Sequence, residues 1–167
     1  MNAKQTLLQK ICDGSFALLT EEDIAKKLHL KGKAAAAVGE LLRSLVQEGA
    51  IYCDLSGRFG TAAQFGALPG TISGNERGFG VFIPDDPALD DLFIPHRALR
   101  GAYNKDSVLV FRKGGRFGDE GEVLTVTKRG YTELVGTFRR ERTGGSLHPD
   151  DRKFSTYIFI PSDRCKG

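Results

Sequence analysis

Two phenylalanines and an arginine have side chains that could bind a flat, negatively charged ligand. Phe79 follows Arg77 in a glycine-rich stretch, and Phe93 lies further along the chain between two aliphatic residues. Because side chains alternate between the two faces of a strand, both rings point outward if the intervening apolar residues fill a core, namely Phe82, Leu92 and Ile94. Bases of single-stranded nucleic acid stack on exposed aromatic rings at roughly 1 to 3 kcal/mol per base, whatever the sequence. The pattern therefore predicts a stacking site beside Arg77.

The alternative is that these strands have the opposite phase. A register shift of one residue exchanges the two faces of a strand, so the rings would then lie in a core. A neighbouring domain could also cover them. Both alternatives remain open at this point.

Basic residues near the two rings are candidates for contacts to phosphate. His96 and Arg97 follow the second strand, and His96 could stack, contact phosphate or have a structural role. The residues predicted to bind single-stranded nucleic acid are thus Arg77, Phe79, Phe93, His96 and Arg97. Further phosphate contacts are predicted at basic residues in other clusters, namely Lys31, Lys33, Arg58, Arg112 and Lys113.

Four aspartates in one short stretch could hold two cations, as in many nucleases: Asp85, Asp86, Asp90 and Asp91. Prolines and turn spacing place them instead in a loop between two strands, where they cap the turn. The three histidines are isolated from one another and from the cysteines, which supports neither a catalytic triad nor a zinc site. We therefore predict no catalytic residue, no metal site and no enzymatic activity for this chain.

Composition limits the class of protein. The 167 residues are 40% hydrophobic and include 21 glycines and no tryptophan, which favours one or two small domains with turn-rich β structure. Three widely spaced cysteines indicate a reducing compartment. No run of 18 apolar residues is present, so we expect a cytoplasmic protein without a membrane partner. The net charge of +3 is mild, and any nucleic-acid binding must depend on local clusters of positive charge.

Residues 1–66 have the pattern of a winged-helix domain. Apolar residues at helical spacing predict three short helices, and Thr20 is the expected N-cap of the second. Two short strand-like runs follow, the second being Phe59-Gly60-Thr61-Ala62, and Gln64 to Pro69 is expected to be a linker. The third helix begins with four consecutive alanines after Lys33, which disfavours sequence-specific reading of DNA.

Residues 67–130 are expected to form a five-stranded barrel of the oligonucleotide/oligosaccharide-binding (OB) type. The predicted strands are 70–74, the two that carry Phe79 and Phe93, 107–111 and 122–126. Residues 131–167 begin the same pattern again, because Gly136-Thr137-Phe138 follows Gly70-Thr71-Ile72 after 66 residues. We predict an incomplete, flexible second repeat there, and an α+β fold of two domains overall.

The stretch Arg77-Gly78-Phe79-Gly80-Val81-Phe82 resembles the first strand motif of cold-shock domains, and Phe93 matches the second motif. Val81 and Pro95 depart from that pattern. With the winged helix and the second repeat included, the whole chain resembles the N-terminal region of bacterial ribonuclease R, in the ribonuclease II superfamily.

The resemblance implies that the chain binds single-stranded or structured RNA and guides it to a 3′ to 5′ exoribonuclease domain that lies outside these residues. Mg²⁺ is implied for that domain alone, and the catalytic domain or the ribosome are implied as further partners. The alternative is a protein-interaction or autoinhibitory module that does not bind RNA directly.

Overall fold

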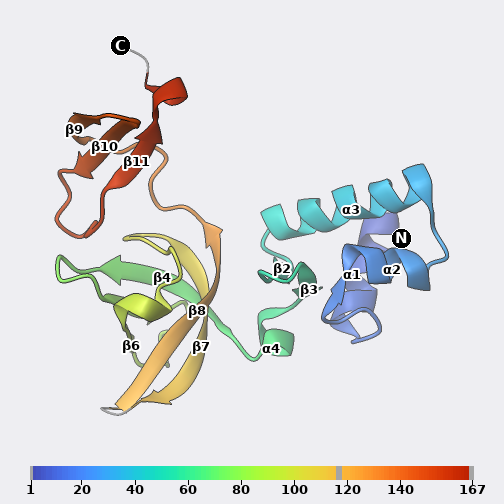
Figure 1. Cartoon of the computed structure of the whole chain (residues 1–167). Helices are drawn as coiled ribbons and strands as arrows, with labels where there is room; N and C mark the ends of the chain where they lie inside the picture. Colours follow the sequence, from blue (N-terminus) through green and yellow to red (C-terminus); the bar gives the residue numbers. More distant parts are fainter. Residues whose placement is uncertain (1, 116–117, 166–167) are drawn as a thin grey trace. The chain divides into compact units, whose positions relative to one another are not determined.

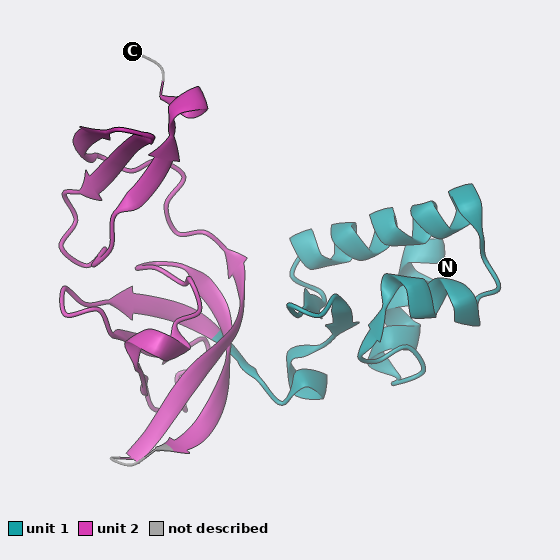
Figure 2. Cartoon of the chain, in the orientation of Figure 1, with its two compact units in different colours: residues 1–69 teal, residues 70–167 magenta. Residues whose placement is uncertain are grey.

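The computed structural model describes residues 2–115 and 118–165. The chain divides into two compact units, Met1–Pro69 and Gly70–Gly167, which Figure 2 shows in different colours. Each unit is described by itself below.

The first unit is built on three helices, α1 (Ala3–Cys12), α2 (Glu21–Lys27) and α3 (Gly32–Gln47). Thr20 is the N-cap of α2: its hydroxyl accepts from the Asp23 backbone N–H at 3.2 Å, and the Asp23 carboxylate accepts from Thr20 in return. The expected cap is therefore confirmed. Among the described residues, no helix combines the length and apolar character needed to cross a membrane.

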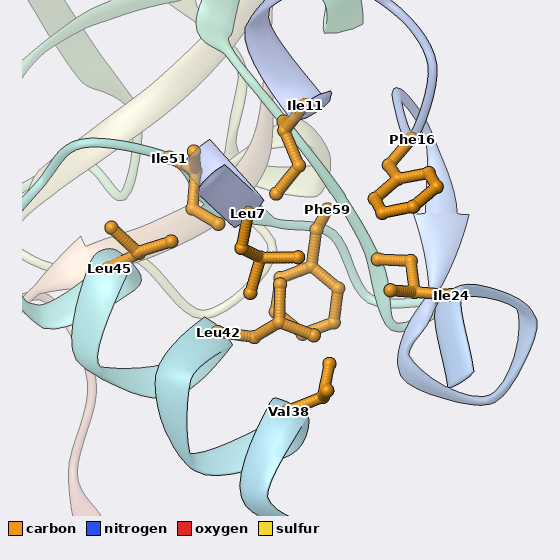
Figure 3. Packing of buried hydrophobic residues seen from close by; sticks show 9 residues of the cluster. All are labelled: Leu7, Ile11, Phe16, Ile24, Val38, Leu42, Leu45, Ile51 and Phe59. Carbon is orange, nitrogen blue, oxygen red and sulfur yellow. The ribbon is translucent and has the colours of Figure 1, made fainter. Parts of the chain in front are cut away.

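One side of each helix contributes to a single apolar core, shown in Figure 3. Ile11, Ile24 and Leu42 are fully buried in it. Burying each such side chain contributes about 1.5 to 3 kcal/mol. The complete cluster of buried residues is Leu7, Ile11, Phe16, Ile24, Val38, Leu42, Leu45, Ile51 and Phe59.

A small sheet completes this unit, with strand order β1 (Leu19–Thr20), β3 (Arg58–Gly60) and β2 (Tyr52–Cys53). The expected strand end at Thr61-Ala62 and the expected linker are wrong in part, because a fourth helix, α4 (Ala62–Phe65), forms there. Thr61 caps α4 in a capping box, and the Gln64 side chain donates to the Ile11 carbonyl at 2.7 Å. The three-helix order expected from the sequence was therefore incomplete.

The second unit contains a closed five-stranded barrel, which confirms the OB-type prediction at the level of architecture. Its strands are β4 (Leu68–Gly74), β5 (Gly80–Pro84), β6 (Leu92–Ile94), β7 (Ser107–Gly115) and β8 (Gly118–Lys128), in the order β4-β5-β6-β8-β7. A short 3₁₀ helix, η1 (His96–Ala98), follows β6. β6 meets β8 in parallel through the register pair Phe93 and Glu120, and this contact closes the barrel.

Strand alternation fills the barrel as expected. Phe82, Leu92 and Ile94 are at most 2% exposed, together with Val108 and Val110 of β7 and Val123 of β8. Gly121 also faces this interior, where an added Cβ would collide with the Ile94 side chain. The outward-facing side chains of β4, β5 and β6 therefore form the surface that is available to a ligand.

A three-stranded sheet follows the barrel in the same unit, formed by β9 (Gly136–Glu141), β10 (Gly144–Pro149) and β11 (Ile158–Pro161). A 3₁₀ turn, η2 (Ser162–Arg164), comes after it. The sheet is an antiparallel meander like β4-β5-β6, and Gly136 pairs with Pro149 as Gly70 pairs with Pro84. The repetition seen in the sequence thus extends to strand pairing. Figure 1 shows the sheet in orange-brown to red beside its labels.

Candidate nucleic-acid interface

Phe79 and Phe93 lie next to each other on the outside of the barrel. Their ring centroids are 5.2 Å apart and the ring planes are inclined by 44°. Phe93 is 44% exposed, and Phe79 is half-buried. A row of outward residues crosses three strands here, because Ser73 pairs with Val81 and Val81 pairs with Phe93. The barrel therefore presents an aromatic pair at one end of this row.

The loop that carries Phe79 has a fixed conformation. The Gly78 N–H donates to the Asn75 carbonyl at 3.0 Å, and the Asn75 N–H donates to the Phe79 carbonyl at 3.1 Å. Gly78 has φ +92°, a left-handed conformation that favours glycine. An added Cβ at Gly78 would also be 3.4 Å from His96 Nδ1.

His96 supports this loop from the other side. Its Nδ1 lies 2.9 Å from the Gly78 carbonyl oxygen, which can only accept, so Nδ1 carries the proton and donates. Nε2 of the exposed ring takes no part in this bond. The structural role considered for His96 is thus present, and it leaves one ring nitrogen for a ligand.

Arg77 and Arg97 are both exposed. The backbone N–H of Arg77 donates to the Asn75 side-chain oxygen at 2.9 Å, which fixes the start of its side chain beside Phe79. Arg97 lies in η1, directly after His96. These two cations flank the elements that hold the aromatic pair.

Arg112 and Lys113 lie on β7 and have carboxylate partners. Arg112 is 3.7 Å from Asp119, and Lys113 forms an ion pair with Glu122, which Arg100 also contacts. The side chains of Arg112 and Lys113 are 43% and 58% exposed. Both remain predicted phosphate contacts, in competition with these carboxylates.

The other three predicted phosphate contacts belong to the first unit. Lys31 and Lys33 are exposed at the start of α3. Arg58 donates from Nε to the buried carboxylate of Asp54 at 2.8 Å, and Asp54 also accepts from the backbone N–H of Ser56 and Arg58. Arg58 is therefore part of the hairpin's own hydrogen bonding.

The aspartates between β5 and β6 are exposed and form a turn. Asp86 accepts from the Ala88 N–H at 2.9 Å through its side chain and from the Leu89 N–H at 3.1 Å through its carbonyl. Within residues 2–115 and 118–165, no group of three or more histidine, cysteine, aspartate or glutamate side chains comes together to hold a metal ion.

Sequence reasoning missed a polar and aromatic cluster that joins the barrel to the β9-β10-β11 sheet. Asn104 donates to the Tyr131 hydroxyl at 3.0 Å and to Asp151 at 3.3 Å, and the Tyr131 hydroxyl donates to Asp151. The Tyr131 hydroxyl, with the Lys153 backbone N–H, holds the pKa of Asp151 below its ordinary value. The rings of Tyr103 and Phe154 stack beside this cluster at 4.3 Å. These partners are 20 to 47 residues apart in the sequence, so no local pattern indicated the cluster.

Comparisons with known proteins agree on one group. A family model described as the ribonuclease B OB domain matches residues 70–126. Ribonuclease R of Acidithiobacillus ferrooxidans is 28% identical over 159 residues, which cover 93% of this chain and 36% of that protein. Ribonuclease R of Thermotoga maritima is 26% identical over 98% of this chain and 23% of its own length. The Escherichia coli protein is 25% identical over 89% of this chain and 18% of its own length. The chain thus spans about a third of these relatives or less.

Among solved structures, that of yeast Ssd1, a pseudonuclease, aligns with 72% of this chain and 18% of its own. The TM-score is 0.48 and the sequence identity is 15%. No conclusion about function rests on this likeness.

Proposed function

Because this chain corresponds to the N-terminal region of bacterial ribonuclease R, we propose that it is an RNA-binding region whose barrel holds single-stranded RNA. The observation that carries this proposal is the aromatic pair of Phe79 and Phe93 on the outer face of the barrel. Each ring offers a face to a base, and Arg77 and Arg97 lie close enough in the chain to serve the adjoining phosphates. His96 Nε2 has no proton while Nδ1 donates to Gly78, so it can accept from a ribose hydroxyl or a base amino group.

The first unit has a supporting role in this proposal, as a winged-helix domain that engages structured RNA. Its three main helices and its β1-β3-β2 sheet are consistent with that class, and α4 is an addition to it. Lys31, Lys33 and Arg58 are its candidate phosphate contacts.

The RNA held by the barrel then passes to an exoribonuclease domain of the same protein that acts from 3′ to 5′ and requires Mg²⁺. The relatives are about three to more than five times as long as the matched region, which leaves room for such a domain. The cytoplasm is the proposed compartment.

The test is binding of an unstructured RNA oligonucleotide, followed by fluorescence anisotropy, to the wild-type chain and to the double variant Phe79→Ala, Phe93→Ala. We expect the double variant to lose at least about tenfold in affinity, because stacking contributes roughly 1 to 3 kcal/mol per base. The matched control is Phe138→Ala, which removes a ring that is 45% exposed on β9, where no stacking is proposed. If the double variant bound RNA as tightly as the wild-type chain, bases would not stack on Phe79 and Phe93.

The same experiment separates the alternative function. A chain that captures a protein partner while showing no RNA binding would be a protein-interaction or autoinhibitory module. In that case the partner should protect Phe93 from solvent.

A further inference from the structure

A groove of about 430 Å³ lies between the barrel and the loop that precedes β11. β4 and β5 form one wall, through the outward side chains of Thr71, Ser73 and Ile83. The other wall comes from two loops that are distant in sequence and contribute Asn104, Lys105, Asp151 and Lys153. None of these residues belongs to the RNA-binding set predicted from the sequence.

The groove continues the row of residues that begins at Phe93. Phe93 pairs with Val81 and Val81 pairs with Ser73, so the row runs from the aromatic pair into the groove over adjacent strands. Two strand spacings are roughly 10 Å. A nucleic-acid strand with a base on Phe93 could therefore extend over β5 and β4 to the groove.

Lys105 is held at the groove in a conformation that lysine rarely adopts. Its φ is +67°, and its N–H donates to the Ile72 carbonyl of β4 at 2.7 Å. Its ammonium group lies 5.2 Å from the centroid of the Tyr131 ring. Left-handed residues other than glycine are uncommon and gather at functional sites. The backbone conformation of Lys105 is therefore a second argument for a site here, separate from the groove itself.

Lys153 reaches the groove from the facing loop. Its N–H donates to the Asp151 side chain at 2.9 Å, and its carbonyl approaches Gly74 so closely that a Cβ there would collide with it. The loop is therefore anchored to the end of β4, with Lys153 exposed.

The one carboxylate of the groove is already engaged within the protein. Asp151 accepts from the Tyr131 hydroxyl, from Asn104 Nδ2 and from the Lys153 N–H. The groove is thus lined by two lysines and by one carboxylate whose oxygens already have protein donors. The hydroxyls of Thr71 and Ser73 add neutral donors on the opposite wall.

We propose that this groove binds the phosphodiester backbone of the same single strand that stacks on Phe79 and Phe93, with Lys105 and Lys153 as the phosphate contacts. The proposal rests on the proposed function and adds a second subsite to it. Ile83, which is 45% exposed in the groove wall, offers an apolar surface to the sugars there.

The experiment compares a tetranucleotide with a dodecanucleotide of the same base, because domains of this type occupy about 4 to 16 nucleotides. The test variant is Lys105→Gln with Lys153→Gln. The matched control is Lys128→Gln with Arg142→Gln, which removes two exposed positive charges of the same unit outside the groove. The wild-type chain and the control should both gain affinity with the longer strand.

In the groove variant we expect the dodecanucleotide to bind about tenfold more weakly than it binds the control, while tetranucleotide affinity stays the same. The dependence of log affinity on log salt should become shallower by about 0.7 for each lost phosphate contact. As a second measurement, the backbone amide signals of Thr71 and Ser73 in NMR spectra should shift with the dodecanucleotide and not with the tetranucleotide.

Equal dodecanucleotide affinity in the groove variant and the control, without shifts at Thr71 and Ser73, would overturn this inference and leave the stacking site intact. If the double variant Phe79→Ala, Phe93→Ala bound RNA as tightly as the wild-type chain, the proposed function would be contradicted instead. A groove variant that loses tetranucleotide affinity equally would show a general effect of charge and would also overturn the second subsite.

Discussion

Gly78 is the residue on which the geometry of the aromatic pair depends most directly. It combines a left-handed backbone with a close approach to His96. The neighbouring hydrogen bonds then place Arg77 and Phe79 on either side of it. A single residue without a side chain thus sets the direction of two candidate contact groups.

Gly78→Ala should therefore weaken RNA binding and lower the free energy of unfolding by about 1 to 2 kcal/mol, since the left-handed backbone is strained for alanine and the new Cβ would touch His96. Urea unfolding and RNA titration would measure the two effects. Gly101→Ala is the control, because Gly101 has φ +81° and open space around its Cβ position. If both variants lost RNA affinity equally, the contact with His96 would have no specific role.

Asp151 gives a second prediction at this scale, which concerns pH. Its pKa is lowered in the folded protein, first by the Tyr131 hydroxyl, so its contribution to stability is present above the ordinary value of 3.8 and is lost as pH falls through the lower folded value. We expect Asp151→Asn to reduce the loss of stability below about pH 4 relative to wild type. Unfolding curves at several acid pH values would measure this difference, and parallel curves for the two proteins would contradict it.

The elements differ in how far the sequence determines them. Strands β5 and β6 were predictable because Phe82, Leu92 and Ile94 alternate with outward residues over a buried core. β1 and α4 were not, because two or four residues show no periodicity and form here through tertiary contacts, such as that of Gln64 with the Ile11 carbonyl. Lys105 could not be predicted as a groove residue either. It has a left-handed backbone conformation and lies next to a loop of the second repeat, and no sequence pattern indicates either feature. The outward position of the aromatic pair was thus predictable and the groove was not.

The contact between β4 and the loop before β11 can be tested through Gly74. A Cβ at this position would collide with the Lys153 carbonyl, so Gly74→Ala should displace that loop from the barrel. We expect faster amide exchange at residues 150–154, with the barrel strands unchanged, as measured by hydrogen exchange. Gly114→Ala is the control, because nothing lies within 4 Å of its Cβ position. Unchanged exchange at residues 150–154 would show that the loop adapts without cost.

In the whole molecule, the buried cluster of the first unit draws only on residues 7–59, while the aromatic pair and the groove belong to the second unit. Each unit therefore has its own apolar interior. The division follows the change from helical periodicity to strand periodicity in the sequence, with the helix α4 near the boundary. The extents of the three domains expected from the sequence, and the flexibility of the last one, remain predictions.

Leu42→Ala tests the independence of the two units. Leu42 is fully buried in the first unit, and its truncation should cost about 2 to 5 kcal/mol, which is a large part of the stability of so small a unit. We expect loss of helical circular dichroism while the barrel keeps its affinity for a short oligonucleotide. A parallel loss of that affinity would show that the first unit takes part in binding at the barrel.

The parallel junction of β6 and β8 has a consequence for the lifetime of the barrel. Within the described part of the chain, Phe93 and Glu120 are the one register pair between these strands, so the junction has fewer paired residues than the β7-β8 hairpin. Local opening concentrates where pairing is sparse. A base stacked on Phe93 would stabilise the pairing of β6 with β8. Bound RNA would therefore slow the local opening of the barrel that binds it.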